Sequence, residues 1–249
     1  MKILVANPNT STGVTERLVA SAQLVATPGT QLLPMTASYG VPYIATRAEA
    51  AIGAAAALEM LAGQRGRIDA AIVAAFGDPG LGGARELFDF PVVGMAEAAM
   101  LMACTLGRRF GIVSFSRSLE PWFSEIVAWH GMTGRCAAIR TLDEGFRTID
   151  DVQEEKEAVL IDLALRTVKN DAADVVILAG APLSGLANKI ADRVPVPLVD
   201  GIQAATVMAE GLVRMRPRKA TAGTFRRPAP KDSKGLAPAL ADVIGHRDS

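Results

Sequence analysis

The sequence is poor in the residues that most often build metal sites and nucleophilic triads. Its 249 residues include two histidines, His130 and His246, and two cysteines, Cys104 and Cys136. Two histidines leave little room for a histidine-based metal site or triad, and the cysteine spacing matches no metal motif. A disulfide framework is not expected either, so a reduced cytoplasmic setting fits better. We therefore expect no metal site.

Long apolar runs and an excess of charge of one sign are also missing. Lys+Arg and Asp+Glu both number 26, so no nucleic-acid or anionic membrane partner is expected. The run Met1 to Pro8 is too short for a signal peptide, and Pro91 to Leu106 contains Glu97 and is too short to span a bilayer. Because half of the residues are apolar, the chain has enough material for a large core. These features predict a soluble cytoplasmic protein.

Short β-rich runs alternate with alanine-rich helical stretches along the chain. Such alternation predicts parallel strands joined by right-handed crossovers, and nearly continuous apolar strands are typical of sheets covered on both faces. The expected strands are Lys2–Ala6, Gln31–Pro34, Ala70–Ala74, Val92–Gly94, Arg109–Val113, Ala137–Arg140, Val175–Leu178 and Leu198–Val199. The expected helices are Val14–Ala26, Arg47–Gly63, Gly83–Phe88, Ala96–Leu106, Pro121–Trp129, Val152–Lys169, Gly185–Arg193, Ile202–Met215 and Leu236–Val243. A basic segment, Arg214 to Lys234, is expected to be a solvated loop, with a binding patch as the alternative.

The chain resembles itself. Ile68–Leu81 aligns with Ala173–Leu186 at an offset of 105, Pro91–Ala99 with Pro197–Ala205 at 106, and Ile3–Thr10 with Gly111–Ser118 at 108. Three blocks in one order at nearly one offset imply duplication of a small βαβ lobe. We expect two lobes, residues 1–95 plus 205–249 and residues 96–204, that face each other about a pseudo-twofold axis with a ligand cleft between their strand tips.

Four loops are expected to line this cleft, at residues 7–12, 75–80, 114–118 and 180–185. The first and third carry Ser, Thr or Asn at the head of a helix, where free backbone N–H groups suit an anionic or carbonyl-bearing ligand. The predicted ligand-binding residues are Asn9, Thr10, Ala75, Phe76, Gly77, Ser114, Ser116, Arg117, Gly180 and Ala181. The alternative for Thr10, Ser11 and Ser118 is that they are helix caps, which is compatible with ligand binding. Tyr43 is expected in a loop that reaches over the cleft.

Five segments in order carry a family resemblance: Asn7–Thr10 (NPNT), Phe76–Leu81 (FGDPGL), Gly94–Ala99 (GMAEAA), Arg135–Ala137 (RCA) and Pro197–Gly201 (PLVDG). Together they resemble the Asp/Glu/hydantoin racemase superfamily, most closely its hydantoin and allantoin racemase branch, over residues 2 to about 240. The resemblance implies two pseudosymmetric α/β lobes and a homo-oligomer. It also implies cofactor-independent racemisation of a carbon next to a carbonyl, in a small cyclic ureide or amino acid.

The same resemblance implies two catalytic cysteines, one from each lobe, on opposite faces of the substrate carbon. One thiolate removes a proton and the other thiol returns one. The matching positions are Ala75 and Gly180, which the internal repeat also pairs at an offset of 105, so both thiols are absent. Cys104 and Cys136 match other places and are expected to be core residues.

Two carboxylates are the candidates to replace the thiols as acid/base groups, Asp78 and Glu97. The alternative for Asp78 is an N-cap of the helix that follows it, and the alternative for Glu97 is a first-turn charge that favours the helix dipole. The repeat partner of Glu97 is Gln203, and Asp200 stands opposite Gly94. No symmetric pair of titratable groups therefore survives across the axis.

These observations predict a hydantoin/allantoin racemase-like enzyme of the isomerase class, without a cofactor. Its substrate is expected to be a small cyclic ureide or carboxylate, bound in the cleft between the lobes and processed without the usual two-thiol mechanism. Two alternatives stay open: a cysteine-independent lyase or hydrolase that acts on a related substrate, and a non-catalytic ligand-binding homologue.

Overall fold

The structure, a computed structural model, describes residues 1–143, 145–149 and 151–247 and contains two four-stranded parallel sheets. The first sheet contains β1 (Lys2–Asn7), β2 (Gln31–Thr36), β3 (Ala70–Val73) and β4 (Val92–Gly94). The second contains β5 (Phe110–Ser114), β6 (Cys136–Thr141), β7 (Val175–Leu178) and β8 (Leu198–Asp200). The strand orders are β2-β1-β3-β4 and β6-β5-β7-β8, and all neighbouring strands are parallel. The same order in both sheets confirms the expected α/β fold of two pseudosymmetric lobes.

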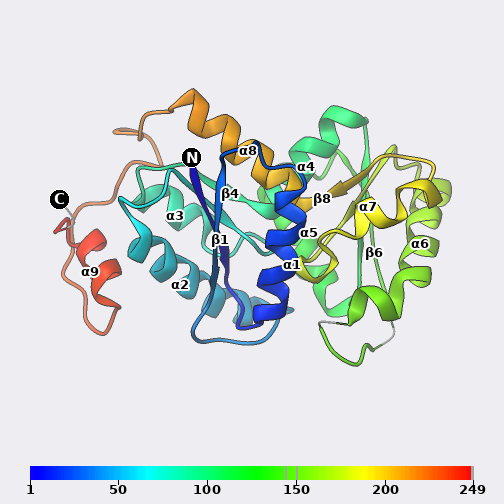
Figure 1. The fold of residues 1–249 in the computed structure, drawn as a ribbon, viewed down its shortest axis with the longest axis horizontal. Coiled ribbons are helices and arrows are strands. Elements are labelled where there is room, and N and C mark those ends of the chain that lie inside the picture. The colour runs from blue at the N-terminus through cyan, green and yellow to red at the C-terminus, as the bar shows by residue number, and fades with distance from the viewer. Residues whose placement is uncertain (144, 150, 248–249) are drawn as a thin grey trace.

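Helices follow the strands much as the alternating pattern predicts (Figure 1). The α-helices are α1 (Thr12–Gln23), α2 (Arg47–Gln64), α3 (Leu81–Leu87), α4 (Met95–Leu106), α5 (Glu120–Trp129), α6 (Val152–Asp171), α7 (Leu186–Ile190), α8 (Gly201–Met215) and α9 (Pro238–Ile244). Three 3-10 turns are η1 (Arg117–Leu119), η2 (Ala181–Leu183) and η3 (Ala191–Arg193). The single helix expected over Gly185–Arg193 is wrong in detail, because the chain tightens after Ile190 and continues as η3.

Both faces of the first sheet are buried, as its apolar strands predict. Along β1, Ile3 and Val5 belong to one core, and Leu4 and Ala6 belong to another on the opposite face. This alternation follows from the two-residue period of a strand. One core therefore lies between the sheet and the rest of the molecule, and the other lies under α2, α3 and α9.

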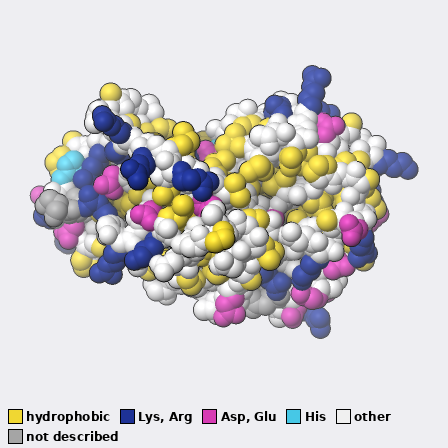
Figure 2. Space-filling view, turned by 45° about the horizontal axis from the view of Figure 1, so that its top comes forward, with side chains coloured by type: hydrophobic (Ala, Val, Ile, Leu, Met, Phe, Trp, Pro, Cys, Tyr) yellow, Lys and Arg dark blue, Asp and Glu magenta, His cyan; other side chains and the backbone are white. Residues whose placement is uncertain are grey.

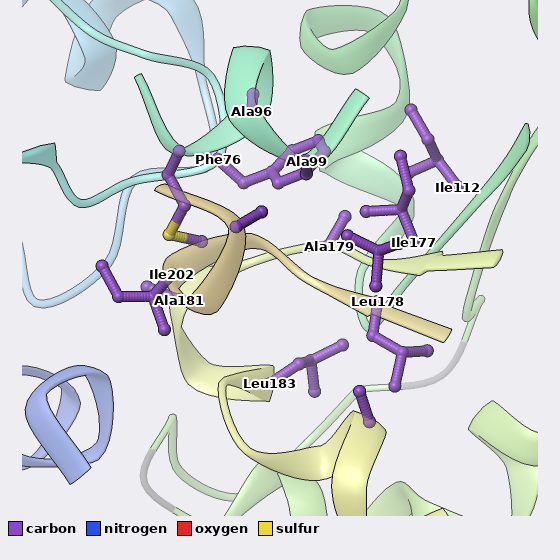
Figure 3. Packing of buried hydrophobic residues seen from close by; sticks show 14 of the residues in the cluster. Phe76, Ala96, Ala99, Ile112, Ile177, Leu178, Ala179, Ala181, Leu183 and Ile202 are labelled. Atoms are coloured by element: carbon purple, nitrogen blue, oxygen red, sulfur yellow. The ribbon is translucent and has the colours of Figure 1, made fainter. Parts of the chain in front are cut away.

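Two helices join the halves of the molecule. α4 packs against α8, and each contacts strands of both sheets: α4 lies on β7 and β4, and α8 lies on β3 and β8. The larger core accordingly contains residues from both halves, and Figure 3 shows Phe76, Ala99, Ala179 and Ile202 within it. The lobe boundaries proposed from the sequence stay a prediction, because the helices at those boundaries contact both halves.

The basic C-terminal segment lies against the first half, at the amino ends of strands and not at the carboxyl ends where the expected cleft loops begin. Arg214, Arg216 and Val243 share a surface groove with Ile68 and Pro91, which lie at the amino ends of β3 and β4. Most of residues 214–234 are exposed, as a solvated loop should be. Figure 2 shows basic side chains interspersed with acidic ones over this half. In the described part of the chain, no helix has the length and apolarity needed to cross a membrane.

Candidate active site between the two sheets

The four loops at the carboxyl ends of β1, β3, β5 and β7 meet around a small cavity between the sheets. Its volume is about 30 Å³, which is room for about one water molecule. The lining residues are Asn9, Tyr43, Ile44, Ala75, Phe76, Phe115, Leu119, Trp122, Phe123, Gly180, Ala181 and Pro182. All four loops expected from the sequence contribute, and the loop after β2 and the start of α5 complete the wall.

The two positions that the family resemblance assigns to cysteine, Ala75 and Gly180, line this one cavity. Gly180 has φ +113°, a conformation that L side chains rarely adopt. A Cβ there would lie 2.7 Å from Cε1 of Phe115. The Phe115 ring therefore occupies the space that a side chain at position 180 would need.

Asn9 brings a fixed amide to the cavity. Its Oδ1 accepts hydrogen bonds from Asn7 Nδ2 and from the backbone N–H of Ser11, each at 2.9 Å. These two donors assign the amide orientation and leave Nδ2 of Asn9 with no bond to another described residue. Since Asn9 lines the cavity, its N–H groups are suited to a carbonyl oxygen of a ligand.

Several other predicted ligand-binding groups bond elsewhere. The Ser114 hydroxyl is buried and donates to the Ala179 carbonyl at 2.7 Å. Ser116 pairs with the Ser118 hydroxyl, and the Arg117 guanidinium pairs with Asp143 at 3.0 Å on the surface. The backbone N–H of Thr10 donates to Val41, and Gly77 packs beneath the Trp122 ring. These residues shape the loops but are not part of the cavity wall.

Of the serine side chains expected as possible helix caps, one caps a helix and one does not. Ser11 caps α1, since its Oγ accepts from the N–H of Val14. Ser118 does not cap a helix through its side chain, because its hydroxyl faces Ser116.

The Asp78 carboxylate caps a different helix from the one predicted. Its own helix α3 starts after Gly80, which has no side-chain cap, so the expected cap of that helix is wrong. The Asp78 backbone is left-handed, with φ +48°, and this turns the carboxylate toward the N-terminus of α4. There it accepts from the N–H groups of Ala96 and Glu97, both at 2.8 Å. Asp78 thus satisfies two orphan donors of α4, a helix that begins seventeen residues further along the chain.

In the second half of the molecule a buried carboxylate also caps a helix, but it comes from the end of a strand instead of from the loop. Asp200, at the end of β8, caps α8 by accepting from the N–H groups of Ile202 and Gln203. Its other oxygen accepts from the N–H of Gly185 and from the hydroxyl of Ser21 on α1. In each half, a buried carboxylate connects the cavity loop, the next helix and the first helix of the opposite half.

Glu97 and His130 extend the Asp78 network behind the cavity wall. Glu97 pairs with the Arg85 guanidinium through two hydrogen bonds of 2.8 and 2.5 Å. His130, just after α5, places Nε2 3.0 Å from Asp78 Oδ2 and Nδ1 3.7 Å from Glu97 Oε1. Sequence reasoning missed His130 because it stands alone in the chain, with no motif spacing. One signal could have indicated it: the helical spacing from Trp122 and Phe123 places His130 on the same face of α5 as those two residues.

Burial is the largest cause of the pKa shifts of Asp78, Asp200 and Cys136. It raises the pKa of Asp78, and the hydrogen bonds from His130 and Ala96 oppose that shift. Burial likewise raises the pKa of Asp200 against the N–H donors around it. Burial also raises the pKa of the Cys136 thiol to about 11, so this thiol stays protonated at neutral pH.

The described residues offer no cluster of three His, Cys, Asp or Glu side chains suited to a metal ion. Cys104 and Cys136 are both free and half-buried, and both pack against the core. Neither is in the cavity wall. The polar side-chain groups of that wall are the Asn9 amide, the Tyr43 hydroxyl and the indole N–H of Trp122.

Comparison with known proteins places the chain in a family. A sequence model described as Asp/Glu/Hydantoin racemase matches residues 3–209. A hydantoin racemase from Paenarthrobacter aurescens is 33% identical over 233 residues, which cover 93% of this chain and 99% of the relative. The structure of allantoin racemase from Klebsiella pneumoniae, at 33% identity, has a TM-score of 0.91 and covers 96% of this chain and 98% of its own.

More distant structures share the fold alone. Unliganded arylmalonate decarboxylase, at 16% identity, has a TM-score of 0.59 over 85% of this chain and 92% of its own. The family model and the similar racemases span most of the chain, and the resemblance noted in the sequence is confirmed. The chain belongs to the Asp/Glu/hydantoin racemase family.

Proposed function

We propose that this protein is an isomerase-class member of its family that binds a small neutral cyclic ureide between the two sheets and acts on it without thiols. The observation that carries the proposal is that Asn9, Ala75 and Gly180 line one cavity. This is where the family resemblance implies substrate and thiols, and two of its similar relatives are named hydantoin racemase and allantoin racemase.

The cavity lining favours a ureide over a carboxylate. Its only polar side-chain groups are the Asn9 amide, the Tyr43 hydroxyl and the Trp122 indole N–H, and its lining residues include no Arg, Lys or His. A carboxylate moved into such a lining would lose its hydration without gaining a counter-charge, at a cost of several kcal/mol. A neutral ring with carbonyl and N–H groups would instead bond to the Asn9 amide and pack its apolar part against the aromatic wall.

Asp78 is the proposed acid/base group, with Glu97 beside it. Asp78 lies three residues after Ala75 on the same loop, and its raised pKa is typical of a carboxyl that can hold a proton. Both carboxylates are engaged behind the wall in this conformation. Their proposed role therefore requires the 75–80 loop to rearrange when ligand enters, which the small volume of the cavity also demands.

A second candidate function is ligand binding without catalysis. It is favoured by one specific observation, that every oxygen of Asp78 already accepts a hydrogen bond from α4 or His130. A cysteine-independent lyase or hydrolase stays the third candidate, since proteins of one fold can catalyse different reactions. The family resemblance also supports a cytoplasmic homo-oligomer, which light scattering after size-exclusion chromatography would test.

The deciding experiment first compares the thermal shifts that hydantoin, 5-phenylhydantoin, allantoin and succinate cause. Each compound that stabilises the protein is then incubated with it in D2O. We expect stabilisation by a ureide and none by succinate. Slow deuterium uptake at the stereocentre that is lost in Asp78→Asn supports the isomerase. Binding without uptake or any new product supports the non-catalytic homologue, and a new product supports the lyase or hydrolase. Stabilisation by succinate alone overturns the ureide proposal.

A further inference from the structure

One face of α5 lies along the cavity loop of the opposite half. The Phe123 ring packs on Phe76 with centroids 4.9 Å apart, and a Cβ on Gly77 would overlap the Trp122 ring. At the end of the same helix, His130 bonds to Asp78. The loop that carries Ala75 and Phe76 is thus held to α5 at three successive points, of which two are apolar and one is titratable.

Three charged groups surround the His130 ring. Asp78 faces Nε2 from the loop after β3, and Glu97 faces Nδ1 from the first turn of α4. Arg85 of α3 lies behind Glu97 and is bonded to it. The His130 side chain is 5% exposed, and the edge of Trp129 covers it with ring centroids 4.6 Å apart. The ring therefore meets two carboxylates in a setting where water screens their charges poorly.

Protonation changes what this ring can do. A neutral imidazole has one N–H, so it bonds to one carboxylate and turns a lone pair toward the other. A protonated imidazole has two N–H donors and a positive charge, which suits both carboxylates at once. Imidazole is also the side chain that ordinarily changes charge between about pH 5 and pH 8.

We propose that His130 is a proton-operated clasp that regulates entry to the site between the sheets. When protonated, it binds Asp78 and Glu97 together and holds the 75–80 loop against α5. When neutral, it keeps one of these contacts, and the loop separates from Phe123 and Trp122 more readily to admit a ligand. The regulation of ligand entry rests on the function proposed above, whereas the clasp itself does not.

The clasp is tested first without ligand. The chain has two histidines, so ring signals in NMR spectra are assigned by one substitution, His246→Gln. Because Glu97→Gln removes one of the two carboxylates that face the ring, we expect the pH-dependent change of the His130 ring signals to move to lower pH in that variant than in the wild type. Amide exchange of residues 75–80 should speed up with pH beyond its chemical rate in the wild type and in His246→Gln, but not in His130→Gln. Ring signals whose pH-dependent change is the same in Glu97→Gln and in the wild type overturn the proposal, and so does loop exchange that is the same with and without His130.

The regulatory step is tested with hydantoin as the probe, by stopped-flow tryptophan fluorescence, to which Trp122 of the cavity wall contributes. We expect the association rate to rise several-fold from about pH 5 to pH 8, with the dependence lost in His130→Gln and kept in His246→Gln. A pH-independent rate in the wild type overturns the regulation. If hydantoin and the other ureides fail to bind while His130 titrates and the loop responds, the proposed function fails and the clasp stands.

Discussion

The Asp78 carboxylate occupies the space that a side chain at position 94 would need. A Cβ built on Gly94 would lie 2.5 Å from Asp78 Oδ2. In the other half, the position equivalent to Gly94 is Asp200, whose own carboxylate caps the following helix. The two halves thus put a carboxylate at the same place in the fold and attach it to the backbone at different positions, which explains why the carboxylates are unpaired in the sequence repeat.

This relationship predicts a large cost for a single methyl group. Gly94→Ala displaces the Asp78 carboxylate and breaks buried hydrogen bonds to α4, which should lower the free energy of unfolding by about 1–3 kcal/mol. Urea unfolding measures this loss. Gly211→Ala is the matched control, because a Cβ there meets no atom within 4 Å and alanine in a helix gains about 0.5–1 kcal/mol over glycine. Equal effects of the two substitutions would contradict the assignment.

Restoring the two thiols should not restore racemisation by a two-thiol mechanism. Ala75→Cys adds one atom at the cavity wall, but Gly180→Cys strains the backbone at φ +113° by about 1–3 kcal/mol and pushes against Phe115. We expect the double variant to be less stable than Ala75→Cys alone. It should also leave the optical rotation of an enantiopure 5-substituted hydantoin unchanged at the rate of thiol chemistry. Thiol-dependent racemisation that iodoacetamide abolishes is the outcome that this geometry forbids.

The burial of Asp78 predicts an unusual pH dependence. Because burial raises its pKa above the ordinary value of 3.8, the folded protein binds this proton more tightly than the unfolded chain. Stability contributed by Asp78 therefore falls as the pH rises from about 3.8 through the folded pKa. Asn at position 78 does not titrate. The stability of the wild type minus that of Asp78→Asn, from urea unfolding at several pH values, should decrease with rising pH, and a difference that increases would be inconsistent with this burial.

Glu210 should show the opposite trend. Burial acts to raise its pKa, but hydrogen bonds from Thr27 and Thr30 outweigh it and lower the pKa below its ordinary value of 4.5. The stability that it contributes is present above about pH 4.5 and is lost as the pH falls through the folded pKa. Glu210→Gln should cost about 1–3 kcal/mol at neutral pH, since the turn at residues 27–30 loses its charged acceptor. Unfolding at lower pH should show this cost shrinking, and a constant cost would rule out the charge as its source.

Much of the fold was predictable because it depends on local patterns. The apolar run at residues 70–74 contains β3, Ala70–Val73, whose residues are all buried, as the lack of alternation indicates. The repeat that pairs Ala75 with Gly180 predicted that these positions would meet, since equivalent strand tips converge about a pseudo-twofold axis. Helix ends were less predictable: Asp78-Pro79 reads as the start of a helix, and the left-handed backbone at Asp78 sends its carboxylate to α4 instead.

The class of fold, the duplication and the family could be predicted from residue type and spacing alone, because each depends on local patterns or on matching segments. The packing around Gly180 and Asp78 became apparent only once the chain was folded. Phe115 fills the space beside Gly180, and His130 contacts both Asp78 and Glu97, each of which lies more than thirty residues earlier in the chain. Such contacts depend on how α5 docks on the opposite half. The packing of α5 on the opposite half depends on the shapes and the burial of many residues together, so it cannot be predicted from any single stretch of sequence.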